Sequence, residues 1–395
     1  MRDRYTISRN FSGTEELYCH HPSRVVAPCA NPMSDLKLDS LRIQNFRTFR
    51  DLTIDRLGRV NLIVGKNNVG KTALMEAAYL WMQRGRLNAI KRLLEDRDEL
   101  NSEKIENHRY SRRQRVMEIK VADSIQNLFN REDSSEAKSP MLLGPCTGKR
   151  DLRLSIESPK QATLFDAEER EEIDLVVSFG KHRRKARYQL AQDFMHEAPG
   201  WHDRRSLDPS HFMRSNGLSD RGRAKIWDHI VEEGPSSEKK MMKFMNIVDD
   251  RVQDVRFTGS DPRIPLVGLK GISERIPLRS MGGGMIRVLD YSIALVDTEG
   301  GVLLIDELEN GLHYSVQSDL WEMIFETAQE LDVQVFATTH SYDCVQAFQQ
   351  ASGEHEEEGM LISLRRKRSD PEEIVAVPID EEELEYAVET HTDVR

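Results

Sequence analysis

The segment from Gly65 to Thr72 reads Gly-Lys-Asn-Asn-Val-Gly-Lys-Thr and matches the pattern G-x-x-x-x-G-K-[ST] at every fixed position. Glycines at its two ends let the backbone turn tightly and present N–H groups to phosphate oxygens, and a helix starting here adds its N-terminal dipole. Lys71 supplies a positive charge for the β and γ phosphates, and the Thr72 hydroxyl is placed to ligate Mg²⁺. The segment therefore predicts a loop that binds ATP with Mg²⁺, formed by Gly65, Lys66, Asn67, Asn68, Val69, Gly70, Lys71 and Thr72.

Two adjacent carboxylates follow an apolar run in Gly301-Val-Leu-Leu-Ile-Asp-Glu307. Four apolar residues predict a buried strand, and ligands of such sheets bind beyond the carboxyl ends of the strands. We expect Asp306 to hold Mg²⁺ and Glu307 to orient and polarise the attacking water. A solvated acidic turn is the alternative interpretation, and the presence of the phosphate-binding loop makes it the weaker one.

A histidine and a glycine-rich segment complete the set of candidate residues. His340 follows the apolar run Val333 to Thr338, so its imidazole can reach the γ-phosphate or the attacking water from a neighbouring strand. Ser280-Met-Gly-Gly-Gly284 precedes an apolar helix, and amides at a helix N-terminus can bind an anion. An incidental histidine and a plain glycine-rich loop are the alternatives, and the order of the four motifs favours the functional interpretation.

The elements that must position these residues predict an α/β fold with a mixed sheet at its core, an antiparallel β-subdomain and a helical insertion. Short alternating strands between 38 and 190 indicate the antiparallel part, and continuous apolar strands after 302 fit a parallel sheet covered on both faces. We expect a disordered extension over 1–35, an N-terminal ATPase lobe over 36–203, the insertion over 204–255, and a C-terminal lobe over 256–395. Met33 is an alternative start of translation.

The composition is that of a soluble globular protein, with 38% hydrophobic and 31% charged residues and a net charge of −11. No apolar run is long enough to span a membrane, and four scattered cysteines suit a reducing cytosol. We therefore expect a cytoplasmic protein without a membrane partner. The negative net charge argues against non-specific coating of nucleic acid. Local contact with DNA or RNA stays open at three basic clusters, and a solvated hairpin tip is the simpler interpretation of each: Arg112–Arg115, Lys181–Lys185 and Arg365–Arg368.

The motif order, from Ile43-Gln-Asn-Phe-Arg47 through the phosphate-binding loop to Thr338-Thr-His-Ser341, resembles that of ABC-type P-loop ATPases of the SMC and OLD (overcoming lysogenization defect) group. Leu278-Arg-Ser-Met-Gly-Gly-Gly-Met285 and Asp306-Glu-Leu-Glu-Asn-Gly-Leu-His313 are similar to stand-alone ATP-binding proteins related to OLD. The resemblance implies a homodimer or higher oligomer that sandwiches two ATP molecules. In such an oligomer, Ser280, Gly282 and Gly283 of one subunit would contact the γ-phosphate of the ATP held by another subunit. It also implies that Arg47 contacts the nucleotide.

The sequence departs from that family pattern in three places. The segment from Ser280 to Gly284, which resembles the signature motif of ABC-type ATPases, lacks a final Gln. Leu308 stands where Pro often follows the Asp-Glu pair. The glutamine that completes the Mg²⁺ shell could be Gln83, Gln114 or Gln126. The residues after His340 carry no clustered Glu and Asp-x-Asp pattern of a Toprim nuclease, so we expect that this chain is not itself a nuclease.

The leading functional hypothesis is an ATPase whose ATP-driven dimerisation controls a nucleic acid or a separate effector protein, such as a nuclease or toxin, in phage defence or DNA maintenance. A regulatory nucleotide-binding scaffold with little turnover is one alternative, and the intact Asp-Glu pair argues against it. The ATPase subunit of a membrane transporter is another.

Overall fold

The computed structural model describes residues 36–99, 102–103, 118–119, 124–130, 139–157, 174–180, 186–189, 207–259, 262–355, 358–379 and 381–390. The expected N-terminal extension and the alternative start at Met33 lie outside these residues. So do Gln114 and the basic clusters Arg112–Arg115 and Lys181–Lys185.

A six-stranded sheet with the strand order β10-β14-β15-β3-β16-β17 carries the predicted motifs. Its first five strands are parallel and β17 pairs antiparallel with β16, so the sheet is mixed, as the sequence predicts. Register pairs Ile305 with Ala337 and Thr338 with Ile63, which brings the carboxyl ends of β14, β15 and β3 to one edge. The strands are β3 (Val60–Gly65), β10 (Ser210–Met213), β14 (Val302–Ile305), β15 (Gln334–Thr338), β16 (Gly359–Lys367) and β17 (Asp370–Ile379).

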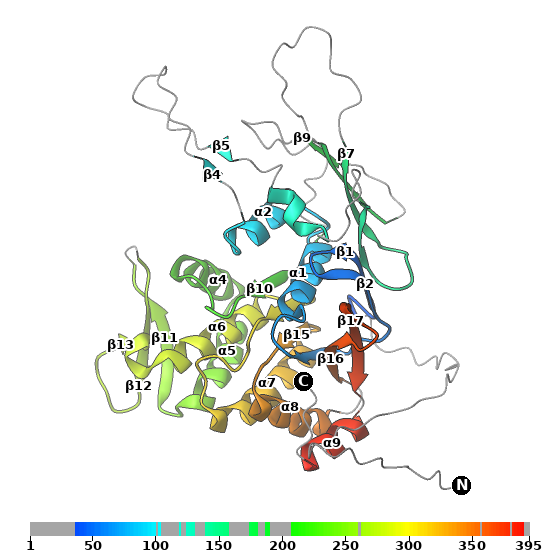
Figure 1. The fold of residues 1–395 in the computed structure, drawn as a ribbon. Coiled ribbons are helices and arrows are strands. Elements are labelled where there is room, and N and C mark those ends of the chain that lie inside the picture. The colour runs from blue at the N-terminus through cyan, green and yellow to red at the C-terminus, as the bar shows by residue number, and fades with distance from the viewer. Residues whose placement is uncertain are drawn as a thin grey trace, which may run out of the picture.

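A second six-stranded sheet is antiparallel throughout and has the order β2-β1-β6-β7-β8-β9. It is the β-subdomain that the short alternating strands predict. The strands are β1 (Leu41–Phe46), β2 (Phe49–Ile54), β6 (Met141–Gly144), β7 (Leu152–Glu157), β8 (Asp174–Phe179) and β9 (Ala186–Gln189); the pair β4 (Ser102–Glu103) and β5 (Glu118–Ile119) stands apart from it. Figure 1 shows β7 and β9 extending away from the central sheet.

Helices and 3₁₀ turns connect and cover the sheets. The helices are α1 (Lys71–Met82), α2 (Leu87–Glu95), α4 (Asp220–Glu233), α5 (Pro235–Val248), α6 (Gly283–Val296), α7 (Gln317–Glu330), α8 (Tyr342–Glu354) and α9 (Glu381–Glu389). The 3₁₀ turns are η1 (Gln126–Leu128), η3 (Leu278–Met281) and η4 (Tyr314–Val316). Within the described part of the chain, no helix has the length and apolar character needed to cross a membrane.

The two faces of the central sheet belong to two hydrophobic cores. Ile63, Leu304 and Phe336 pack on the side of α1 and the antiparallel sheet, whereas Leu62 and Val335 pack on the side of α5, α6, α7 and α8. Because successive side chains of a strand alternate between faces, a sheet buried on both faces needs apolar residues at nearly every position. This requirement explains the continuous apolar runs of β3, β14 and β15.

The stretch 204–255, expected to be helical, contains α4 and α5 but also a strand of the central sheet. β10 pairs parallel with β14 at the sheet edge, and β11 (Val252–Phe257) begins a small antiparallel sheet with β12 (Pro265–Leu269) and β13 (Ile276–Pro277). The expectation of helix is therefore wrong for 210–213 and for 252–255. A strand of four residues, Ser-His-Phe-Met, is too short to show a period, and its pairing with a distant strand decides its conformation.

Candidate functional site

The predicted phosphate-binding loop joins β3 to α1, as its sequence pattern requires. Gly65 and Gly70 have φ angles of 147° and 91°, values that strongly favour glycine. A Cβ atom on Gly70 would lie 2.7 Å from the Cγ2 atom of Thr48, and one on Gly65 would lie 2.5 Å from the carbonyl oxygen of Leu364. Both glycines are therefore needed for conformation and for space. The N-terminus of α1, with its free N–H groups, follows immediately.

Lys71 lies folded over this loop. Its ammonium group donates to the carbonyl oxygens of Gly65 at 2.7 Å and Lys66 at 3.1 Å, and it lies 3.4 Å from Nδ1 of His340. The side chain is buried, so its charge acts in a low-dielectric environment, where its attraction for an anion is stronger than in water. The arrangement places a cation where the loop would hold phosphate oxygens.

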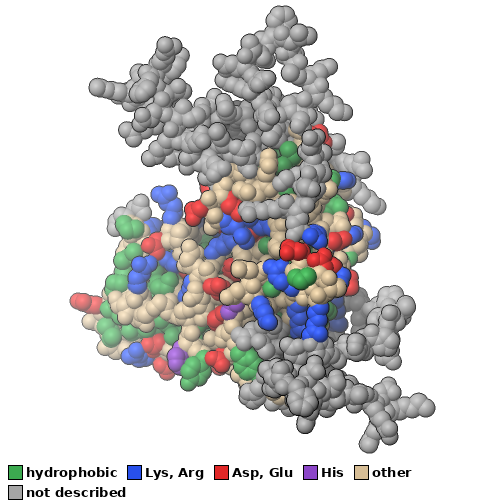
Figure 2. Space-filling model, viewed as in Figure 1, with side chains coloured by type: hydrophobic (Ala, Val, Ile, Leu, Met, Phe, Trp, Pro, Cys, Tyr) green, Lys and Arg blue, Asp and Glu red, His purple; other side chains and the backbone are tan. Residues whose placement is uncertain are grey.

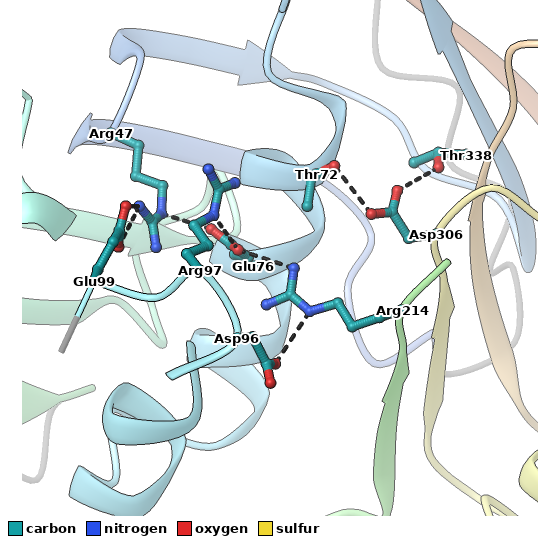
Figure 3. A network of polar contacts seen from close by, with 9 residues as sticks. All are labelled: Arg47, Thr72, Glu76, Asp96, Arg97, Glu99, Arg214, Asp306 and Thr338. Carbon is teal, nitrogen blue, oxygen red and sulfur yellow. Dashed lines mark hydrogen bonds and ion pairs between the residues drawn. The ribbon is translucent and has the colours of Figure 1, made fainter. Parts of the chain in front are cut away.

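Thr72 and Asp306, the two predicted metal ligands, meet across the sheet edge. The Thr72 hydroxyl donates to Oδ2 of Asp306 at 3.0 Å, and the Thr338 hydroxyl donates to Oδ1 of Asp306 at 2.6 Å (Figure 3). A hydroxyl and a carboxylate are hard oxygen donors. Mg²⁺ typically binds one or two protein oxygens and completes its shell with phosphate and water. The pair therefore fits Mg²⁺ held together with a nucleotide.

Glu307 and His340, the predicted catalytic pair, lie close together. Oε1 of Glu307 is 3.9 Å from Nε2 of His340, and both side chains are about two-fifths exposed. Glu307 has a φ of +54°, which is uncommon outside glycine and is often found at functional sites. The backbone N–H of His340 donates to Oε1 of Glu309 at 2.7 Å, so a second carboxylate of the same loop fixes the histidine segment.

One cavity of about 830 Å³ is lined by Lys71, Thr72, Glu307 and His340. Asp306 is not one of its lining residues, but it accepts the hydrogen bond of Thr72, which is. Seven residues that the sequence analysis did not single out also line the cavity, together with Arg366 of a basic cluster: Thr48, Ala73, Arg97, Glu99, Asn127, Asn130 and Glu372. Asn127 lies in η1 and Asn130 follows this turn by two residues. Neither periodicity nor a motif marks this segment in the sequence. The lining is mixed in charge. On the face of the molecule that Figure 2 draws, Lys and Arg side chains are likewise interspersed with Asp and Glu.

Arg47 lines the cavity but is already engaged in ion pairs. Its Nε lies 2.5 Å from Oε2 of Glu76, and its Nη1 donates to both carboxylate oxygens of Glu99 at 2.9 and 3.0 Å. Arg97 and Arg214 also bind Glu76, at 2.8 and 3.0 Å, and Figure 3 shows this cluster beside Thr72. Since Asp96 pairs with Arg214, the cluster holds three guanidinium groups and three carboxylates. Nη2 of Arg47 is buried without a hydrogen-bond partner among the described residues.

The predicted signature lies outside this cavity. Ser280, Gly282 and Gly283 are exposed at the start of α6, and none of them is among the described residues that line the cavity. They do not meet the phosphate-binding loop within one chain. The resemblance predicts this separation, because it assigns them to the nucleotide of a second subunit.

Helix α6 is anchored to α4 and to the edge of the sheet that carries Asp306 and Glu307. The Tyr291 hydroxyl donates to the carbonyl oxygen of Leu308 at 2.8 Å, and burial raises the pKa of Tyr291. Asp290 forms a buried ion pair with Arg223, whose Nη2 lies 3.1 Å from Oδ2 of Asp290. Burial raises the pKa of Asp290, while Arg223 counteracts that rise.

Two of the three glutamine candidates for the Mg²⁺ shell are described. Gln83 follows the C-terminal end of α1 and donates to the Ser210 hydroxyl at 2.7 Å, whereas Thr72 lies at the other end of this helix. It is not at the site. Gln126 is exposed in η1, and its neighbour Asn127 lines the cavity instead.

The third basic cluster also contributes to the cavity. Arg366 donates through Nη2 to the carbonyl oxygen of Asn68 at 3.1 Å, and Lys367 pairs with Glu373 at 2.7 Å. The bond of Arg366 holds the β16–β17 hairpin against the phosphate-binding loop, whereas Lys367 and Glu373 pair within the hairpin. Arg366 therefore supports the site.

Two protein-family models match consecutive parts of the chain. One, described as an AAA ATPase domain, matches residues 36–206. The other matches residues 202–343 and is described as an AAA domain, with a link in that description to the AbiEii toxin of a Type IV TA system.

Similar proteins include an "ATP/GTP phosphatase" of Helicobacter pylori, which is 21% identical over 333 residues, 79% of this chain and 88% of that protein. The DNA replication and repair protein RecF of Clostridioides difficile is 47% identical over 45 residues, 11% of this chain and 12% of RecF. Among solved structures, an SMC head domain bound to the C-terminal winged-helix domain of ScpA has 12% identity and a TM-score of 0.47, with 89% of this chain and 99% of that chain covered. Because the two AAA models match consecutive parts of a chain whose loop from Gly65 to Thr72 joins a parallel strand to a helix, the chain belongs to the AAA-type P-loop ATPases.

Proposed function

We propose that this chain hydrolyses ATP with Mg²⁺ and that it dimerises around the bound nucleotide. The observation that carries the proposal is the contact between Thr72, at the start of α1, and Asp306, directly after β14. Thr72 lines one cavity together with Lys71, Glu307 and His340. Oxygen ligands for a metal, a cation for phosphates and a candidate base thus converge from three strands and one helix. The AAA matches and the name of the Helicobacter pylori relative support the same chemistry.

The proposed mechanism depends on positioning and electrostatics, as is general for phosphoryl transfer. The N–H groups of the loop and the ammonium group of Lys71 bind the phosphates. Thr72 and Asp306 would hold Mg²⁺, which when bound neutralises charge on the β and γ phosphates. Glu307 accepts a proton from the attacking water, and His340, 3.9 Å away, orients this water or contacts the γ-phosphate.

Glu307→Gln tests the catalytic assignment. The amide retains the shape of the side chain but cannot accept the proton, so we expect phosphate release to fall about 10²- to 10⁴-fold, while ATP binding persists. Phosphate release and the binding of a fluorescent ATP analogue are measured side by side. Glu326→Gln, a change at an exposed position of α7, is the control and should retain turnover. Normal turnover in Glu307→Gln would refute the role of Glu307.

The same variant tests dimerisation. Ser280, Gly282 and Gly283 are exposed and lie apart from the cavity of their own chain, which supports a role at the nucleotide of a second copy. Because Glu307→Gln retains its ATP, it should elute as a dimer with ATP and as a monomer without it. Adding Ser280→Arg should prevent the dimer, while Ser273→Arg, in the exposed turn after β12, should not. A monomer at saturating ATP would contradict the proposal.

Dimer formation driven by ATP would control an effector protein or a nucleic acid. The description of the second matched family, which mentions a toxin, supports an effector in a defence system. A pull-down from the native host with Glu307→Gln, with and without ATP, tests this part. An ATP-dependent partner is the expected result, and recovery of the same proteins regardless of ATP would contradict control by the nucleotide.

A further inference from the structure

Thr338 joins the predicted metal ligand to the predicted base. It is the last residue of β15 and fully buried. Its hydroxyl donates to Oδ1 of Asp306 at 2.6 Å and accepts from the backbone N–H of Glu307 at 2.8 Å. The Thr338 hydroxyl therefore forms one hydrogen bond with Asp306, the proposed metal ligand, and one with Glu307, the proposed base.

The first of these bonds fixes the carboxylate of Asp306. Thr72 donates to one oxygen of this group and Thr338 to the other, so Asp306 is held from both sides (Figure 3). Without the Thr338 hydroxyl, Oδ1 would lose this donor and the carboxylate could rotate about its terminal bond. Hydrogen bonds to metal-ligating carboxylates orient them, and their loss typically lowers metal affinity 10- to 100-fold.

The second bond fixes the backbone of Glu307. This residue has a φ of +54°, a conformation that non-glycine residues adopt only where surrounding contacts enforce it. Two contacts from Thr338 do so: its hydroxyl accepts from the N–H of Glu307, and its carbonyl oxygen accepts from the N–H of Leu308 at 3.0 Å. The direction of the Glu307 side chain thus depends on the same residue that holds Asp306.

We propose that Thr338 is a positioning residue that couples the metal carboxylate of Asp306 to the base Glu307. This proposal rests on the proposed ATPase function and assigns a role to a side chain to which the motifs of the sequence analysis gave none. The hydroxyl does the positioning, and the methyl group of Thr338 only fills space in the buried strand.

Two substitutions separate the hydroxyl from the methyl group. Thr338→Val retains the shape and removes the hydroxyl, whereas Thr338→Ser retains the hydroxyl and removes the methyl group. Thr338→Ala compared with Thr338→Ser gives the same contrast if the valine variant does not fold, which thermal unfolding without nucleotide would reveal. All variants are made in the full chain.

The first measurement does not need turnover. Binding of a fluorescent ATP analogue is titrated with Mg²⁺, and Thr338→Val should raise the half-saturating Mg²⁺ concentration about tenfold or more. The second measurement is steady-state hydrolysis at saturating Mg²⁺. Here kcat should fall about 10- to 100-fold in Thr338→Val with a KM for ATP within about threefold of wild type, because the residue acts through Asp306 and Glu307. Thr338→Ser should match wild type within about threefold in both.

Unchanged Mg²⁺ dependence and unchanged kcat in Thr338→Val would overturn the proposal, as would equal impairment in Thr338→Ser. If the wild type binds nucleotide with Mg²⁺ but does not hydrolyse it, the proposed reaction fails, and the Mg²⁺ titration still decides the role of Thr338 at Asp306. If the wild type binds no nucleotide, both proposals fall.

Discussion

Replacing Glu76 by Gln should destabilise the chain more than any substitution of an exposed acid. Glu76 is completely buried on α1, one turn after Thr72, and its carboxylate forms ion pairs with Arg47, Arg97 and Arg214 at 2.5, 2.8 and 3.0 Å. The amide can retain an acceptor for two of these arginines. Its NH₂ group would then face Nε of Arg47, which is also a donor, and the cluster would carry one uncompensated positive charge.

The magnitude follows from the burial of this cluster. Removing one partner from a buried ion pair typically costs about 3–5 kcal/mol, because the remaining charge stays away from water. Glu76 and Arg47 are both more than nine-tenths buried, so solvent cannot compensate for the lost charge. We therefore expect Glu76→Gln to lower the free energy of unfolding by about 3–5 kcal/mol. Saturating ATP should restore part of this loss, since Arg47 and Arg97 line the cavity and an anionic ligand supplies the missing negative charge.

Urea unfolding followed by tryptophan fluorescence measures this effect. The control is Asp51→Asn, which breaks the ion pair of Asp51 with Arg42 on the exposed face of the antiparallel sheet. Asp51 and Arg42 are each about half exposed, so Asp51→Asn should lower the free energy of unfolding by under about 1 kcal/mol. This loss should vanish in high salt. The effect of Glu76→Gln should persist there. The reasoning is refuted if Glu76→Gln costs no more than the control, or if high salt removes its effect.

Two further predictions concern the ion pair between α4 and α6 and the phosphate-binding loop. Arg223→Met should lower the free energy of unfolding at pH 8 by about 3–5 kcal/mol, because it leaves Asp290 buried without its partner. Burial already raises the pKa of Asp290, and loss of Arg223 raises it further, so the destabilisation should shrink as the pH falls and Asp290 becomes neutral. If urea unfolding shows that Arg223→Met lowers the free energy of unfolding equally at pH 5 and pH 8, the proposed role of the Asp290 charge is contradicted. Gly70→Ala should abolish binding of a fluorescent ATP analogue, because its Cβ would collide with Thr48. Gly148→Ala, at another positive φ but in an exposed turn, should bind normally.

The residues of the candidate phosphate site could be predicted because their chemistry fixes their spacing along the chain. The loop from Gly65 to Thr72 needs glycines, a cation and a hydroxyl at set positions, and the structure gives it the expected strand and helix. Asp306 and His340 each follow an apolar strand, and parallel pairing of neighbouring strands then brings both to the same edge. The mixed sheet was predictable for the same reason.

The remainder of the cavity depends on contacts between distant segments. Glu99 and Asn127 lie in stretches without periodicity, and their places follow from packing against Arg47 and the antiparallel sheet. Strand β10 is equally invisible in the sequence, since four residues carry no period and only β14 makes them a strand. Arg366 belonged to a recognised basic cluster, but its position beside Asn68 depends on the hairpin that β17 forms with β16.

The strand order of the central sheet also constrains how the chain can fold during synthesis. Strand β3 pairs on its two sides with β15 and β16, and Val60 and its partner Gly359 are about 300 residues apart. At a ribosomal rate of roughly 5–20 residues per second, β16 is synthesised roughly 15–60 s after β3. Helix α1 and the antiparallel sheet can cover one face of β3 meanwhile, but Leu62 and Val64 on the other face depend on helices that emerge later. A nascent chain stalled before β14 would expose an apolar strand with unpaired edges, which makes it a substrate for chaperones and prone to aggregation.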